Sequence, residues 1–131
     1  MTYLKKILLV DPAVQANDRL RHALEETGKY VIKQEHEYRN VLNAARWFQP
    51  DLILLDVMTA GPKTSAVARE LQEDANFKDT PLVFLSEDAS AEGKILSGGM
   101  LQGYSFLANP VALDDLVRCV GELLTSEPDC A

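Results

Sequence analysis

The sequence predicts an α/β domain with a doubly wound parallel sheet whose two faces are covered by helices. Short apolar, β-branched runs alternate with helical patterns, which is typical of parallel strands joined by crossover helices. The runs interpreted as strands are Lys6–Val10, Tyr30–Lys33, Leu52–Leu55, Leu82–Leu85 and Tyr104–Leu107. The third run contains no polar residue, as expected for a central strand that is buried on both faces.

Five helices are predicted between and after these strands. Apolar residues three or four positions apart form one face in the patterns over 20–27 and 41–48. Gly28 is expected to end the first helix as a C-cap, and Pro50 to end the second. Further helices are predicted over 64–75 and 91–98, and the helix over 113–124 has the strongest apolar stripe.

Length and composition indicate one globular domain. The chain has 131 residues, of which 47% are hydrophobic and 25% are charged. A chain of this length buries roughly two thirds of its unfolded surface, so its core needs neither a metal nor a disulfide. We expect a domain over residues 1–125 and a polar tail over residues 126–131.

Charge and cysteine content exclude several classes of function. The net charge is −7, and an acidic surface repels phosphate backbones and anionic lipids, so we expect no nucleic-acid and no membrane partner. No run approaches the ~20 apolar residues that span a bilayer. Cys119 and Cys130 make no disulfide framework, which favours a reducing compartment, the cytoplasm.

Polar residues follow the predicted strands at the edge where parallel sheets form their sites. These residues are Asp11, Asp56, Ser86 and the pair Asn109-Pro110. Two carboxylates side by side form a hard-oxygen site that suits Mg²⁺. A carboxylate beside a cation can attack a phosphoryl group, whereas an aspartate after a strand can also simply cap a turn.

Three segments together resemble the response-regulator receiver domain. They are Ile7–Asp11, Pro50–Met58 and Pro81–Ser86, and the last predicted helix is similar to the last helix of that family. The resemblance covers nearly the whole chain. It implies a flavodoxin-like sheet of five parallel strands in the order 2-1-3-4-5.

The resemblance also implies roles for single residues. Asp56 is then the phosphoacceptor, which takes a phosphoryl group from a histidine kinase or a phosphotransfer protein. Asp11, Asp56 and the backbone carbonyl of Met58 would hold Mg²⁺. Ser86 would be the switch hydroxyl, and Phe106 the aromatic residue that reports the switch. Beyond slow hydrolysis of its own aspartyl phosphate, the chain is not expected to be an enzyme.

The chain departs from the receiver pattern around this pocket. Pro12 stands where receivers carry a second acid, and Asn109 stands where they carry a lysine before Pro110. Glu87 replaces the small residue that usually follows the switch hydroxyl. The pocket thereby loses a metal ligand and the cation that would contact the phosphoryl oxygen, so we expect weak Mg²⁺ binding and impaired phosphorylation.

Two functional interpretations therefore stay open. The first is a phosphoacceptor receiver in a two-component phosphorelay, and the second is a pseudo-receiver that acts as a docking module independent of phosphorylation. A flavodoxin is disfavoured because residues 11–17 contain no Ser or Thr for an FMN phosphate. A haloacid-dehalogenase phosphatase is disfavoured because Met58 stands where its second aspartate is required.

The resemblance further implies a surface for partners. In receivers the fourth helix, the fifth strand and the fifth helix contact the downstream protein, and the same surface supports homodimers. The corresponding residues here are Lys94, Ser97, Gln102, Phe106, Asp115 and Arg118.

Overall fold

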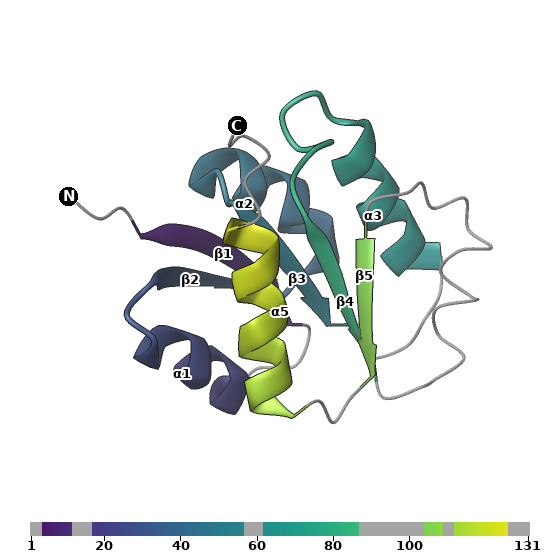
Figure 1. Ribbon diagram of the computed structural model, residues 1–131. Helices are drawn as coiled ribbons and strands as arrows, with labels where there is room; N and C mark the ends of the chain where they lie inside the picture. The colour runs from purple at the N-terminus through teal and green to yellow at the C-terminus, as the bar shows by residue number, and fades with distance from the viewer. Residues whose placement is uncertain (1–3, 12–16, 57–61, 87–103, 109–111, 126–131) are drawn as a thin grey trace.

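The computed structural model shows a parallel β-sheet between two layers of helices (Figure 1). It describes residues 4–11, 17–56, 62–86, 104–108 and 112–125, with only the backbone described for residues 62–65, 86, 104–108 and 125. The strands are β1 (Lys5–Val10), β2 (Tyr30–Glu35), β3 (Leu52–Asp56), β4 (Leu82–Ser86) and β5 (Tyr104–Ala108). They form one sheet in the order β2-β1-β3-β4-β5, all parallel, as the resemblance implied.

Four of the predicted helices fall within the described residues. They are α1 (Asp18–Glu26), α2 (Val41–Phe48), α3 (Pro62–Glu73) and α5 (Leu113–Thr125), and a 3-10 turn, η1 (Tyr38–Asn40), precedes α2. The helix predicted over 91–98 lies outside the described residues. The third helix begins two residues earlier than predicted, because proline suits the first position of a helix.

The two faces of the sheet carry separate apolar cores. Leu8, Ile53 and Phe84 pack on the side of α2 and α3. Ile7, Leu54 and Leu116 pack on the side of α1 and α5. Every residue of Leu52–Leu55 is at most 1% exposed, so the predicted burial of this strand on both faces is confirmed.

The first two helices end in different ways. Thr27 is the C-cap of α1, one residue before the predicted Gly28, and Gly28 follows it with a φ of 73°, a left-handed conformation that commonly ends a helix. Gln49, after α2, also adopts the left-handed region, with a φ of 56°, and its N–H bonds the carbonyl of Ala45 at 2.7 Å. The sequence did not indicate this conformation, because glutamine seldom adopts it; Pro50 follows and prevents the helix from continuing.

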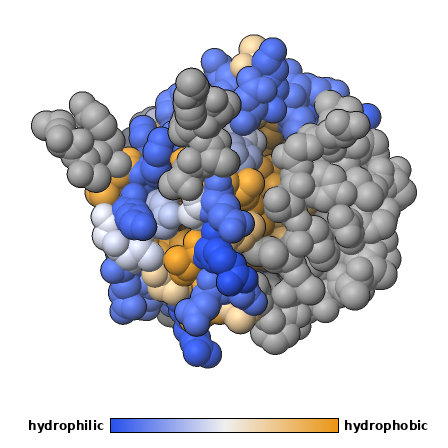
Figure 2. All heavy atoms as spheres, viewed as in Figure 1, coloured by the Kyte–Doolittle hydropathy of each residue, from blue (hydrophilic) through white to orange (hydrophobic). Residues whose placement is uncertain are grey.

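The last helix lies across the sheet with one face buried. Leu116, Val120 and Leu124 are buried against the sheet, whereas the charged side chains of α5 point outward. Figure 2 shows this hydrophilic stripe with hydrophobic residues on either side of it. Within the described parts of the chain, no helix is both long enough and apolar enough to traverse a bilayer.

Candidate functional site

Two buried carboxylates meet at the carboxyl edge of the sheet. Asp11 directly follows β1, and Asp56 is the last residue of β3. These strands are neighbours, with Val10 opposite Leu55, so the two aspartates occupy adjacent positions. Asp11 is 0% exposed and Asp56 is 8% exposed. Because burying a carboxylate without partners is costly, this pair requires hydrogen-bond donors or a cation.

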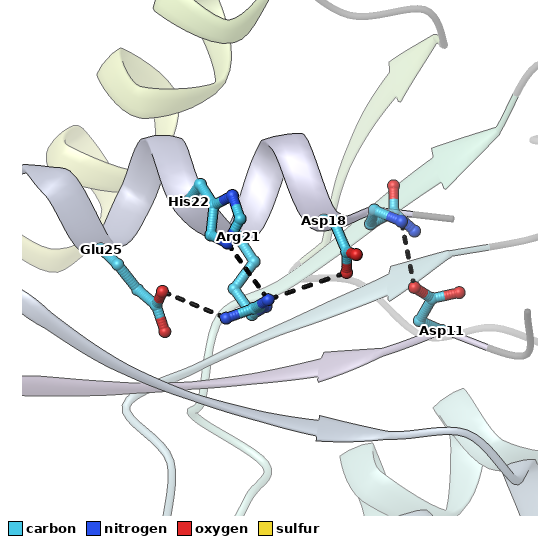
Figure 3. A network of polar contacts seen from close by, with 6 residues as sticks. Asp11, Asp18, Arg21, His22 and Glu25 are labelled. Carbon is cyan, nitrogen blue, oxygen red and sulfur yellow. Dashed lines mark hydrogen bonds and ion pairs between the residues drawn. The ribbon is translucent and has the colours of Figure 1, made fainter. Parts of the chain in front are cut away.

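One donor residue serves both carboxylates. The backbone N–H of Asn17 donates to Oδ2 of Asp11 at 3.2 Å, and its side-chain Nδ2 donates to Oδ2 of Asp56 at 2.5 Å. Figure 3 shows the Asp11 carboxylate facing the start of α1, of which Asp18 is the first residue. Asn17 was not predicted as a site residue; its only sequence signal is an asparagine directly before a helix, which normally indicates an N-cap.

The segment after β2 holds the backbone of both aspartates. The imidazole Nδ1 of His36 lies 2.7 Å from the carbonyl oxygen of Asp11, so Nδ1 carries the proton, because a carbonyl only accepts. The hydroxyl of Tyr38 donates to the carbonyl oxygen of Asp56 at 2.9 Å. Residues from two segments, the one before α1 and the one after β2, thus contact the two strand ends. Neither His36 nor Tyr38 was predicted as a site residue from the sequence.

Tyr38→Phe is expected to lower the free energy of unfolding by about 0.5–1.5 kcal/mol. The ring of Tyr38 packs against the α2–α3 core and is retained in phenylalanine, so the change isolates the hydroxyl. Urea denaturation followed by circular dichroism measures the difference. Unchanged stability would show that the bond to the Asp56 carbonyl contributes nothing.

The other predicted site residues are placed only in part. Ser86 is the last residue of β4, and Asp56 pairs with Leu85, so the Ser86 backbone lies at the same edge of the sheet. Phe106 lies in β5 opposite Phe84. The side chains of Ser86 and Phe106 are outside the described structure, as are all of Pro12, Met58, Glu87, Asn109 and Pro110.

The described side chains supply only some of the ligands that a divalent cation needs. Two carboxylates on adjacent strands are the oxygen ligands that Mg²⁺ prefers. Among the described residues, however, no third acid, histidine or cysteine joins them in a cluster of metal ligands. Asn17 also occupies one oxygen of each carboxylate.

A separate hollow of about 600 Å³ lies between η1 and α3. Its walls include Tyr38, Arg39, Val67 and Glu70, but neither of the paired aspartates. We place the candidate site at Asp11 and Asp56, because paired buried carboxylates offer a specific chemistry and the hollow offers only mixed surface side chains.

The curated proteins to which the chain is similar include a response regulator. No family model matches the chain. It is 28% identical over 120 residues to Protein PilH of Pseudomonas aeruginosa, which covers 91% of this chain and 97% of PilH. It is 27% identical over 126 residues to Response regulator Rre1 of Synechocystis sp., which covers 92% of this chain. The chain spans only 52% of the length of Rre1.

Solved structures that are similar to this chain include receiver domains. The receiver domain of a signal transduction histidine kinase from Syntrophus aciditrophicus superposes with a TM-score of 0.79 at 25% identity, covering 97% of this chain and 95% of that one. The receiver domain of the sensor histidine kinase PA1611 from Pseudomonas aeruginosa has a TM-score of 0.74 at 21% identity, covering 95% of this chain and 100% of that one. In the PA1611 structure a magnesium ion is coordinated in the active-site cleft.

The chain has the α/β fold of the receiver domains that it resembles, and two buried aspartates lie at the carboxyl edge of its sheet. The chain is a homologue of the response-regulator receiver domains of two-component signal transduction, which confirms the resemblance seen in the sequence. Nothing in these comparisons favours the interpretation as a docking module independent of phosphorylation.

Proposed function

We propose that this receiver domain accepts a phosphoryl group on Asp56 from a histidine kinase or a phosphotransfer protein. The observation that carries the proposal is the pair of buried carboxylates at the carboxyl edge of the sheet, with Asp56 at the end of its central strand. Ligand sites of such sheets form at this edge. The proposed domain comprises residues 1–125, and the cytoplasm is its proposed location.

The proposed reaction is a nucleophilic displacement at phosphorus. A carboxylate oxygen of Asp56 attacks the phosphoryl group of a phosphohistidine, and a P–O bond forms as the P–N bond breaks. The electron pair of the broken bond stays on the imidazole nitrogen of the donor. The product is a mixed anhydride on Asp56, and its hydrolysis by water is the only turnover that we propose for this chain.

Mg²⁺ is the proposed cofactor. Asp11, Asp56 and the Met58 carbonyl would hold it, and a bound cation would neutralise negative charge that develops on the phosphoryl oxygens. Because Pro12 replaces an acid, the proposed affinity is low. The hydroxyl of Ser86 would donate to a phosphoryl oxygen at the same edge of the sheet.

Pro12→Asp is expected to tighten Mg²⁺ binding at least about tenfold. A carboxylate ~4 Å from a cation interacts by up to ~4 kcal/mol per pair of unit charges at an effective dielectric constant of 20, and a tenfold gain needs only about 1.4 kcal/mol. Titration calorimetry measures the affinity. Pro12→Asn is the matched control, because it removes the proline without adding charge. Equal affinities for the two variants would contradict the expectation.

Two further departures from the receiver pattern would make the phosphorylated state less stable. Asn109 offers a neutral hydrogen bond where a lysine would supply a full charge, and Glu87 would repel a phosphoryl group that it faced. Stabilisation of the aspartyl phosphate, and its coupling to Ser86 and Phe106, are therefore proposed to be looser than in receivers with the full pattern.

The signal is proposed to leave through the surface around β5 and α5. On α5, Arg118 donates to Asp115 at 2.6 Å, and both side chains are exposed. A downstream protein, or a second copy of the chain, would contact this pair together with residues of the preceding segment. The proposed members there are Lys94, Ser97, Gln102 and Phe106.

Phosphoryl transfer can be tested without knowing the kinase. We expect the intact mass to increase by one phosphoryl group when the chain is incubated with acetyl phosphate and Mg²⁺. The increase should be lost when Mg²⁺ is removed by a chelator, because the paired carboxylates then lack a counter-charge. An unchanged mass at saturating donor and Mg²⁺ would contradict the proposed function.

A further inference from the structure

Asn17 binds the two site carboxylates simultaneously. Its backbone N–H reaches Oδ2 of Asp11 at 3.2 Å, and its side-chain amide reaches Oδ2 of Asp56 at 2.5 Å. Asn17 itself is only 8% exposed. Because an ionised carboxylate only accepts hydrogen bonds, the NH₂ group must be the part of the amide that faces Asp56.

The side chain of Asn17 does not serve the helix that it precedes. Asn17 is the N-cap residue of α1, and its carbonyl accepts the N–H of Arg21 at 2.9 Å. Its side chain makes no capping hydrogen bond. Asparagine is among the preferred capping residues because its side chain normally bonds a free N–H of the first turn. Here the amide faces Asp56 instead, so its orientation is not a consequence of capping.

The position of the amide matters for cation binding. A cation shared by Asp11 and Asp56 uses carboxylate oxygens of both residues, and Asn17 occupies Oδ2 of each. In the absence of a cation, donors at these oxygens offset the repulsion between two buried negative charges. The same donors compete with a cation for the lone pairs.

We propose that Asn17 is a neutral plug of the acidic pocket. Its amide stabilises the cation-free pocket by binding Asp56, and it competes with a divalent cation for that oxygen. The plug thereby lowers the affinity for Mg²⁺ and acts as a positioning residue. The inference rests on the part of the proposed function in which Asp11 and Asp56 hold a cation, and it is independent of phosphoryl transfer.

Removing the amide is expected to tighten Mg²⁺ binding. Asn17→Ala should increase the affinity measured by titration calorimetry with MgCl₂ at least about tenfold, the factor that corresponds to one hydrogen bond to a charged group. Without Mg²⁺ the variant should melt at a lower temperature than the original chain, because Asp56 loses the hydrogen bond from the Asn17 amide. Saturating Mg²⁺ should shrink this difference.

Two further variants separate the plug from other effects. Asn17→Ser provides a side chain that can cap α1 but is too short to reach Asp56, so its affinity for Mg²⁺ should increase even if Asn17→Ala does not fold. Asn43→Ala removes an exposed asparagine of α2 and should change neither the affinity nor the melting temperature beyond experimental error.

The proposed role of Asn17 is contradicted if Asn17→Ser binds Mg²⁺ no more tightly than the original chain, or if neither chain binds Mg²⁺ at all. A gain in Mg²⁺ affinity without any phosphoryl transfer from acetyl phosphate would support the plug and contradict the proposed function. The two proposals therefore fail by different results.

Discussion

Asp56→Asn is expected to abolish phosphoryl transfer to the chain while the domain stays folded. An amide is a far weaker nucleophile than a carboxylate, so the variant should gain no mass with acetyl phosphate and Mg²⁺. The substitution preserves the size of a side chain that is only 8% exposed. The amide carbonyl oxygen can still accept the hydrogen bond that Asn17 donates to Asp56. Circular dichroism then verifies the fold.

The matched control for this experiment is Asp79→Asn, which changes an exposed aspartate remote from the paired carboxylates in sequence. This variant should gain one phosphoryl group to the same extent as the original chain. A mass gain that persists in Asp56→Asn would place the phosphoacceptor at another residue and contradict the account.

Phe84→Ala is expected to lower the free energy of unfolding by about 3–5 kcal/mol. Phe84 is 0% exposed in β4 and belongs to the core between the sheet and α2–α3. Truncation removes the ring and leaves a cavity that a strand hydrogen-bonded on both sides cannot close. Since small domains are stable by only about 5–15 kcal/mol, this is a large share of the total.

Trp47→Ala is the matched control for the loss of a large aromatic residue. Trp47 is 77% exposed on α2, and its one described aromatic interaction is with the Lys33 amino group, 5.1 Å from the ring centroid. Its loss should cost no more than about 1 kcal/mol. Urea denaturation followed by circular dichroism compares the two variants. A similar loss of free energy of unfolding in the two variants would contradict the assignment of Phe84 to the core.

The fold was predictable because its strands and helices carry strong local patterns. The run Leu52–Leu55 has no polar residue, and the structure buries it on both faces. The apolar residues predicted to share a face over 113–124 form the buried face of α5. Differences occur at the ends of elements: α3 begins at Pro62, and β2 extends to Glu35. Polar residues such as Gln34 and Glu35 carry little strand preference, so edge-strand pairing decides where that strand ends.

The candidate site was predictable only where topology alone places a residue. Asp11 and Asp56 meet because the carboxyl ends of neighbouring parallel strands share one edge of the sheet. Asn17, His36 and Tyr38 lie outside the helices and strands that periodicity reveals, in loops or in a short 3-10 turn. Their contacts depend on how these segments return to the sheet, and a single sequence carries no signal for that path.

The most direct test of the central claim identifies the residue that carries the phosphoryl group. The chain is treated with acetyl phosphate and Mg²⁺, and borohydride then reduces the acyl phosphate to a homoserine residue, which peptide mass spectrometry locates. We expect homoserine at position 56 and aspartate at positions 11, 51 and 79. Homoserine at another position, or at none in a chain whose intact mass has increased, would contradict it.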